Sequence, residues 1–304
     1  MTERHALVSD IQQDLSSLGV RQGDHVLVTA AGRFMKLPSD GNQRMDAAGL
    51  LLDALLASVG DSGTIVALPF TSAAWTGYGR RKLPVYDRST PPTTGRFAAA
   101  VAAHPDAHRS THPMNSFAAI GARASELVKF HTPWSHSFRP IEDLVDWHGK
   151  MLLVGTVDVS PGFSSVHLAQ HHLGLSTQNL TSGRLSTRFR DPWGRVQVFH
   201  KRDIPGCSMG FNKMYPLYRK AQIVSEGTVA HAPAMLGDLA DAYDVDIATL
   251  LTDPLFVLCD NPQCSNCRAS LTYNRRDWVP YWRARRDWSR VVATVTGLDP
   301  EKSK

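Results

Sequence analysis

Long hydrophobic runs, abundant cysteine and a strong excess of one charge are all missing from this sequence of 304 residues. No segment approaches the ~18 consecutive apolar residues of a membrane span, and the first residues lack the apolar core of a signal peptide. These absences exclude a membrane protein and predict a soluble protein of the cytoplasm. The net charge of +5 and the pI near 9.1 are weak support for any anionic partner.

The remaining composition is that of a globular protein, with 42% hydrophobic and 20% charged residues, which excludes a disordered or fibrous chain. Helical spacing of apolar residues predicts helices over 6–18 and 46–58, and short β-branched runs predict strands over 25–30 and 64–69. This β–α–β order favours a parallel sheet with a right-handed crossover. Residues 150–155 are expected to add a further central strand.

The character of the chain changes after about residue 176. A hairpin is expected around the turn at 191–194, followed by helices over 209–221, 233–243 and 246–252. The predicted fold class is α/β, with a mainly parallel central sheet flanked by helices and a mixed C-terminal portion. We expect one unit over 1–304, made of a core (1–175) and this mixed portion (176–304).

A first candidate for catalysis follows the predicted strand at 150–155. In the stretch SSVHLAQH, which begins at Ser164, a helix places His167, Gln170 and His171 on one face. α/β proteins usually bind ligands beyond the carboxyl ends of parallel strands. His167 is therefore either a general base, since imidazole titrates near neutral pH, or a buried histidine with satisfied hydrogen bonds.

A second candidate is the stretch RSTHPMNS, which begins at Arg109 and contains Ser110 and His112. Guanidinium, hydroxyl and backbone N–H groups together suit a phosphate or a polarised carbonyl. The alternative is a polar turn set by Pro113.

Taken in order, these pieces resemble the aminoglycoside 3-N-acetyltransferase family. The resemblance covers residues 10–175 and rests on the segments GDHVLVTA, DAAGLLLDALLASVG, GTIVALPF, RSTHPMNSFAAIGARA, KMLLVG and SSVHLAQHH. It implies an acetyl-CoA-dependent N-acetyltransferase of the antibiotic-resistance type. The core at 1–175 would then bind acyl-CoA.

The resemblance also implies site residues. Family members carry a Thr/Ser-x-x-His-x-x-Glu pattern, which matches Ser164, His167 and Gln170 and implies that His167 deprotonates the acceptor amine. Arg109, Ser110 and His112 match the family segment that lines the acyl-CoA and catalytic region. The loop after the first strand, including Thr29, Ala30 and Ala31, would approach the pantetheine or phosphates.

Three departures from the family pattern stand out. Gln170 replaces a glutamate, Arg139-Pro140 replaces Ser-Pro, and Ala30-Ala31-Gly32 replaces a serine-rich stretch. Glutamine can orient a histidine, but it carries no negative charge that would raise its basicity or attract a cationic amine.

The acceptor implied by the family is a small-molecule amine, with the 3-amino group of an aminoglycoside as the first candidate. Such polycations need several carboxylates around the site, and Asp87, Glu142, Asp143 and Asp158 are candidates. An amine of natural-product or peptide metabolism is a rival acceptor. The alternative function is a catalytically inactive relative that serves as a ligand-binding or interaction module. We expect no nucleic-acid or membrane partner, and a homodimer is the expected assembly.

Three of the four cysteines, Cys259, Cys264 and Cys267, lie within nine positions. In a cytosolic chain, clustered cysteines indicate metal binding rather than disulfides. Cys207 or His200 would complete a tetrahedral structural zinc site; the alternative is a set of unrelated reduced thiols.

Two further patterns have ordinary interpretations. The segment HLAQH at 167–171 resembles a zinc-peptidase motif without its catalytic glutamate, so a peptidase is rejected. The stretch from Arg275 to Arg290 interleaves arginines with tryptophans. It suits nucleic-acid or cofactor-phosphate contact, or a helix that packs its tryptophans on the core, and we favour packing because no broader basic surface accompanies it.

Overall fold

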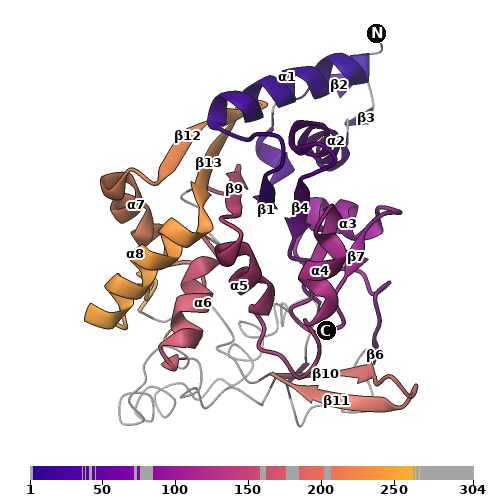
Figure 1. The fold of residues 1–304 in the computed structure, drawn as a ribbon, viewed down its shortest axis with the longest axis vertical. Helices are drawn as coiled ribbons and strands as arrows, with labels where there is room; N and C mark the ends of the chain where they lie inside the picture. Colours follow the sequence, from indigo (N-terminus) through magenta and orange to yellow (C-terminus); the bar gives the residue numbers. More distant parts are fainter. Residues whose placement is uncertain are drawn as a thin grey trace.

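The computed structural model describes residues 3–267, apart from 36, 38, 41–42, 45, 72–73, 76–84, 158–161, 176–184, 202–206, 263 and 265–266. A seven-stranded sheet with the order β12-β13-β9-β1-β4-β8-β7 lies at its centre (Figure 1). Its strands are β1 (His25–Ala30), β4 (Thr64–Ala67), β7 (His108–Arg109), β8 (Ala118–Gly121), β9 (Lys150–Val154), β12 (Val224–Val229) and β13 (Ala232–Asp238). The helices are α1 (Glu3–Leu18), α2 (Ala47–Val59), α3 (Arg96–Ala103), α4 (Ala124–Lys129), α5 (Arg139–Asp146), α6 (Ser165–His172), α7 (Tyr215–Ala221) and α8 (Leu239–Thr252), with short 3-10 turns η1 (Gly32–Phe34) and η4 (Phe211–Met214).

The central sheet is mixed, which corrects the prediction of a mainly parallel one. β1 pairs in parallel with β9 and with β4, whereas the other described neighbours pair antiparallel. The β–α–β order predicted the parallel centre correctly. The outer strands carry no sequence signal for direction, because pairing at a sheet edge depends on how the connections return.

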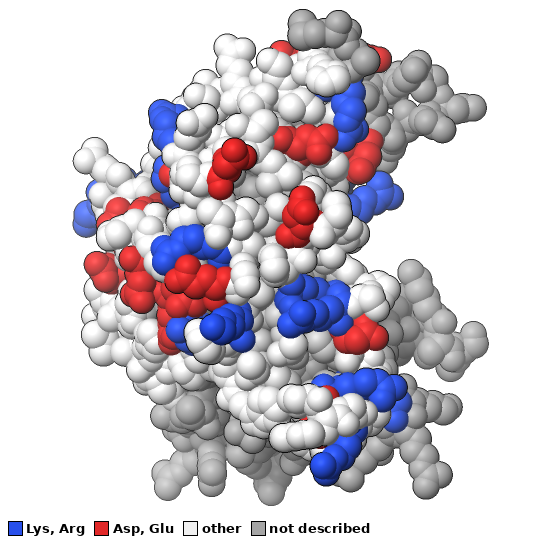
Figure 2. Space-filling view, turned by 45° about the vertical axis from the view of Figure 1, so that its right-hand side comes forward, with Lys and Arg blue, Asp and Glu red and all other residues white. Residues whose placement is uncertain are grey.

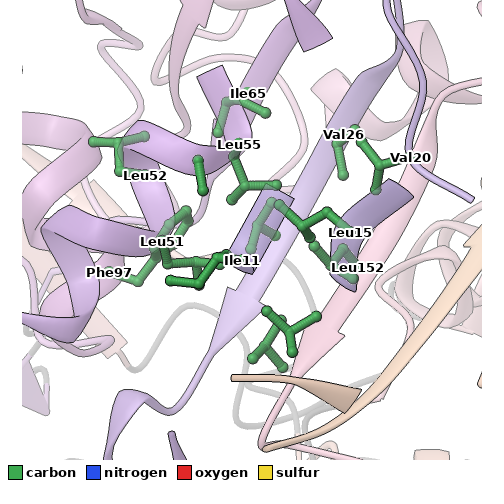
Figure 3. Packing of buried hydrophobic residues seen from close by; sticks show 14 of the residues in the cluster. Ile11, Leu15, Val20, Val26, Leu51, Leu52, Leu55, Ile65, Phe97 and Leu152 are labelled. Carbon is green, nitrogen blue, oxygen red and sulfur yellow. The ribbon is translucent and has the colours of Figure 1, made fainter. Parts of the chain in front are cut away.

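The two faces of the sheet are covered by different helices. Along β1, Val26 and Val28 face the cluster built from α1, α2 and α3, whereas Leu27 faces the cluster built from α4 to α8. This alternation follows from the two-residue period of a strand. Figure 3 shows the first cluster, in which Ile11 and Leu15 of α1 pack with residues of α2 and of the sheet.

Local signals explain why α2 begins and ends where the sequence predicted. The Asp46 side chain accepts a hydrogen bond from the Ala48 N–H at 3.2 Å, which caps the first turn. Gly60 ends the helix with a φ of +63°, a conformation that glycine adopts without a Cβ penalty.

A second, smaller sheet contains β10 (Leu185–Arg190), β11 (Val196–His200), β5 (Ala74–Trp75) and β6 (Val85–Tyr86). The predicted hairpin is confirmed, because β10 and β11 pair antiparallel around the turn at 191–194. A separate pair joins β2 (Ser39–Asp40) and β3 (Gln43–Arg44).

The prediction of a helix over 233–243 is wrong in its first half. Residues 232–238 form β13, which pairs with β9 and with β12, and α8 begins only at Leu239. The C-terminal portion therefore contributes two strands to the central sheet. In the described part of the chain, no helix is long and apolar enough to cross a membrane.

Candidate functional site

Helix α6, which carries His167, follows β9 and lies on the face of the sheet covered by α4 to α8 (Figure 1). Val166, Leu168 and Ala169 are fully buried or nearly so in that core, whereas His167 is half-buried. The helix is therefore fixed by its apolar neighbours, and the imidazole lies at the edge of the core.

The imidazole of His167 is held between two aromatic rings. It stacks on Phe138 with ring centroids 4.3 Å apart and an interplanar angle of 15°. Phe211 approaches it edge-on, with centroids 4.7 Å apart at 66°. Neither phenylalanine was selected from the sequence: Phe138 lies in the loop before α5, and Phe211 begins the turn η4. Such contacts restrict the orientation of the imidazole.

Gln170 lies one turn after His167, and its Oε1 is 3.3 Å from His167 Nδ1. A neutral imidazole that donates from Nδ1 to this oxygen keeps its lone pair on Nε2. Gln170 is 1% exposed, and its Nε2 has no hydrogen-bond partner among the described residues. The side chain is thus placed to orient His167, as the sequence suggested that glutamine could.

Ser164 precedes α6 and is buried. Its carbonyl accepts a hydrogen bond from the His167 N–H at 3.1 Å, and its own N–H points to the sulfur of Met151 at 3.1 Å. A contact between its hydroxyl and a substrate stays a prediction.

Thr29, Ala30 and Ala31 lie at the carboxyl end of β1, beside the end of β9. The Ala31 N–H donates to the Val154 carbonyl at 2.9 Å, and the Thr156 hydroxyl reaches the Thr29 carbonyl at 3.4 Å. This is the sheet edge at which open α/β folds bind ligands. Contact of these residues with acyl-CoA stays a prediction.

Arg109 is buried and its donors are engaged within the protein. Its guanidinium donates to the carbonyls of Pro69, Arg88 and Thr90 and to the Ser116 hydroxyl, at 2.6–3.1 Å. Burial lowers the pKa of this group. Arg109 therefore joins two loops in this structure, and a contact with acyl-CoA stays a prediction.

Ser110 and His112 form a buried polar cluster with His131, which was not selected from the sequence. The two imidazoles stack with centroids 4.7 Å apart and planes 8° apart, and the Ser110 hydroxyl lies 3.0 Å from His131 Nδ1. Burial lowers the pKa of His112 well below its ordinary value. Burial, and then the neighbouring His136, lower the pKa of His131 to about 3. Both histidines are neutral at physiological pH.

The loop between α4 and α5 brings the two predicted segments together. It carries His131, which stacks on His112, and His136, which stacks on His171 of α6 with centroids 4.0 Å apart. It ends at Phe138, which covers His167. The signal available in the sequence was HTPWSHSF, two histidines and two aromatics between predicted helices.

Of the four carboxylates selected for a cationic acceptor, Glu142 lies beside α6. One of its oxygens is 3.0 Å from Nε2 of both His136 and His172. Burial opposes ionisation, but His172, His136 and Arg139 together hold the pKa of Glu142 below its ordinary value. Asp143 pairs with Arg139 at 2.8 Å, whereas Asp87 bonds to Ser89. Asp158 lies outside the described residues.

The four cysteines converge as the sequence predicted. The Sγ atoms of Cys207, Cys259, Cys264 and Cys267 all lie within 4.8 Å of one another. Cys207, rather than His200, is the fourth member of this cysteine cluster. A hydrogen bond with the Cys264 thiol raises the pKa of Cys207 to about 12.

The Arg-rich stretch 275–290 lies outside the described residues. On the face drawn in Figure 2, acidic and basic side chains are interspersed and no continuous basic surface is seen.

Comparison with known proteins places the chain among acetyltransferases. The family described as Aminoglycoside 3-N-acetyltransferase matches residues 42–250. The aminoglycoside N(3)-acetyltransferase IX of Micromonospora chalcea is 32% identical over 48% of this chain and 56% of its own length. The aminoglycoside N(3)-acetyltransferase VIII of Streptomyces fradiae is 29% identical over 75% of this chain and 86% of its own length.

Solved structures share the fold. The apoenzyme of aminoglycoside acetyltransferase AAC(3)-IVa is 24% identical, with a TM-score of 0.68, over 89% of this chain and 96% of its own. AAC-IIIb in its binary complex with CoASH is 21% identical, with a TM-score of 0.64, over 83% and 97%. The sheet and helices described above are thus those of this group. The chain belongs to the aminoglycoside 3-N-acetyltransferase family, which confirms the family and the enzyme class predicted from its sequence.

Proposed function

We propose that this protein transfers the acetyl group of acetyl-CoA to the 3-amino group of an aminoglycoside, with His167 as the general base. The observation that carries the proposal is the pairing of His167 Nδ1 with Gln170 Oε1 at 3.3 Å. This pairing directs the basic Nε2 away from the helix partner, and the two phenylalanine rings fix the plane of the imidazole.

The reaction needs one proton acceptor and donors for an oxyanion. An ammonium group has no lone pair, so it must lose a proton before its nitrogen attacks the thioester carbon. Nε2 of His167 takes that proton, and the neutral amine then attacks the thioester carbon and forms the C–N bond. The resulting oxyanion is stabilised by hydrogen-bond donors, and the C–S bond then breaks. The CoA thiolate leaves and takes the second proton of the attacking nitrogen, and no covalent intermediate on the protein is required.

The known proteins support the choice of donor and acceptor. The curated relatives that match are named aminoglycoside N(3)-acetyltransferases. AAC-IIIb was solved with CoASH, a mutant of AAC(3)-IVa was solved in complex with a gentamicin, and AAC-VIa was solved with sisomicin bound. For this chain we assign the donor to the carboxyl edge of β1 and β9, where Thr29, Ala30 and Ala31 lie.

The carboxylate of Glu142 suits a polycationic acceptor. It is ionised, is 28% exposed and lies next to α6. It would attract an amine of the acceptor toward the same end of α6 that carries His171 and His172. The absence of a carboxylate at Gln170 makes such a neighbouring charge more important in this chain.

The test is mass-spectrometric detection of acetylated product. The full chain is incubated with acetyl-CoA and a panel of aminoglycosides and simpler amines, and each aminoglycoside is matched with an analogue that lacks the 3-amino group. We expect a mass increase of one acetyl group only where that amine is present. Acetylation of the analogues would contradict the assigned position, and product from simple amines alone would favour the rival acceptor class.

The alternative, an inactive binding module, finds no support in the comparisons. It predicts that acetyl-CoA binds with no product from any member of the panel. Acetyl-CoA binding is measured by calorimetry on the same preparation, so a missing donor site and a missing reaction are distinguished.

We further propose that the cysteine cluster holds a structural zinc ion. A tetrahedral zinc–thiolate site with Zn–S bonds of about 2.3 Å separates its sulfurs by about 3.8 Å, and the Sγ atoms of Cys207 and Cys264 lie 3.7 Å apart. The Cys267 N–H points to Cys264 Sγ at 3.5 Å, and the Cys259 N–H points to Cys267 Sγ at 3.4 Å. These contacts suit thiolate ligands. Elemental analysis is expected to find one zinc per chain and none in Cys264→Ser.

Three other expectations stay predictions from the sequence. These are a single acyltransferase domain over 1–304, assembly as a homodimer, and a location in the cytoplasm.

A further inference from the structure

The segment that starts at Cys207 connects the cysteine cluster to the imidazole of His167. Four residues after Cys207, Phe211 lies edge-on to that imidazole. Phe211 is 1% exposed, so its ring is enclosed on all sides. One of the two rings that hold His167 therefore belongs to a segment that begins at a cysteine of the cluster.

The same segment packs closely on the chain that leads to the other three cysteines. A Cβ on Gly210 would lie 2.2 Å from the Val257 carbonyl oxygen, so the two backbones touch at this glycine. The Lys213 ammonium donates to the Leu258 carbonyl at 2.6 Å and pairs with Asp260 at 2.7 Å. These contacts lie immediately before and after Cys259. The segment that carries Phe211 is thus packed directly on the chain that carries Cys259.

Two backbone hydrogen bonds lie at the start of this segment. The Phe211 N–H donates to the Ser208 carbonyl at 3.0 Å, and the Lys213 N–H donates to the Gly210 carbonyl at 3.2 Å, within the single turn η4. η4 runs directly into α7, which fixes its C-terminal end, whereas its N-terminal end follows the stretch from Cys207. A bond from Cys207 to a metal ion would fix that N-terminal end.

Phe211 also meets the chain just before α6. Gly162 has a φ of +68°, and a Cβ at this position would lie 2.5 Å from the Phe211 Cβ. The phenylalanine is therefore wedged between the residues that precede Ser164 and the imidazole itself. A shift of the segment from Cys207 to Met214 would therefore displace both the residues before Ser164 and the imidazole of His167.

We infer that Phe211 is a positioning residue for His167 and that zinc in the cysteine cluster holds Phe211 in place, so that metal loading controls acetyl transfer although the metal touches neither substrate. The inference rests on the proposed role of His167 as the base. A displacement of about 1 Å in a catalytic group lowers turnover by as much as about 100-fold. The metal thus has two roles: it joins the segments of the C-terminal portion, and it determines the rate of turnover.

The test measures zinc content, the state of His167 and turnover on one set of full-length proteins. Zinc is measured by elemental analysis. The side-chain NMR signal of His167 is assigned in protein with labelled histidine by its loss in His167→Gln. The variants are Phe211→Leu, which keeps apolar volume but removes the ring, and Cys264→Ser. Cys264→Ser can fail to fold for reasons unrelated to zinc. Wild type is therefore also stripped of zinc with a chelator, measured, and then reloaded with zinc and measured again.

We expect Phe211→Leu to keep its zinc, to shift the His167 signal and to lower kcat at least about tenfold, with little change in KM for acetyl-CoA. Stripped wild type is expected to show the same shift and loss, both reversed by zinc. The control is Leu51→Ala, which opens a cavity on the opposite face of the sheet and should leave the His167 signal unchanged.

An unchanged His167 signal in Phe211→Leu, or in stripped protein, would overturn the inference, as would wild type without zinc. If Leu51→Ala shifts the His167 signal by an equal amount, the effect comes from a general loss of stability, and the inference is also overturned. If wild type acetylates no acceptor, the proposed function fails, whereas zinc content and the His167 signal still decide the coupling.

Discussion

Oε1 of Gln170 lies 3.3 Å from Nδ1 of His167, on the same face of α6 and one turn away. The residue that replaces a family glutamate thus keeps its orienting contact but contributes no charge. If His167 is the base, as proposed, its other surroundings must supply the charge that Gln170 lacks.

Substitution of Gln170 by glutamate should raise turnover of a cationic acceptor. The carboxylate would keep the contact with Nδ1 and would stabilise both the imidazolium formed in the reaction and the approaching amine. The lower pH at which kcat/KM is half-maximal should move upward. Gln170→Leu, of similar size but without a hydrogen-bond acceptor, should lower kcat by about tenfold or more. Equal rates for glutamine and leucine at this position would show that the contact has no role.

Substitution of Gly162 by alanine should disturb the site without touching a charged group. The new Cβ would lie 2.5 Å from the Phe211 Cβ, on a backbone with a φ of +68° that alanine rarely adopts. We expect a loss of at least about 1 kcal/mol in the free energy of unfolding, measured with urea. The matched control is Gly174→Ala, which also has a positive φ but meets nothing within 4 Å. Equal losses would mean that backbone strain, rather than the Phe211 contact, explains both.

The buried histidine pair should make the protein sensitive to acid. His131 has a folded-state pKa of about 3 against an ordinary value of 6.5, so the unfolded chain binds more protons between these limits. The stability from the neutral pair is full above about pH 6.5 and decreases as the pH falls toward 3. Urea unfolding of wild type and His131→Gln between pH 4.5 and 7.5 should give a shallower slope for the variant. Parallel slopes would contradict the assignment.

Asp246 should have the opposite effect on stability, between about pH 4 and pH 8. It is fully buried, accepts a hydrogen bond from the Tyr218 hydroxyl at 2.5 Å, and burial raises its pKa to about 8. The folded protein therefore holds this proton where the unfolded chain has lost it, so stability falls as the pH rises from about 4 to about 8. Asp246→Asn keeps an acceptor for Tyr218 and removes the titration. We expect its advantage over wild type to grow up to about pH 8, and a constant difference across this range would contradict the account.

The centre of the fold was predictable from the sequence because its signals are local. The short apolar run of β1, the cap at Asp46 and Gly60 at the end of α2 each arise from residues close together in the chain. The hairpin of β12 and β13 was missed. Its turn at Ala230 and His231 has φ values of 46° and 65° without the glycine or asparagine that usually marks such a turn.

The candidate site was predictable only in part for the same reason. His167 was found by its position after a strand and by the family pattern, and the cysteines were found by their spacing. Phe138, Phe211 and His131 were missed, since the sequence around an aromatic ring or a histidine carries no mark of the distant residue on which it will stack. The grouping of Cys207 with the other three cysteines was an expectation that the structure bears out in position.

The central claim is that His167 removes the proton from the acceptor amine. The most direct test compares kcat/KM of wild type and His167→Ala on the best aminoglycoside acceptor, with acetyl-CoA binding measured on both proteins. We predict a decrease of about 100- to 10,000-fold in the variant, with acetyl-CoA bound as in wild type. A variant that keeps the wild-type rate would contradict the account, because another group would then be the base.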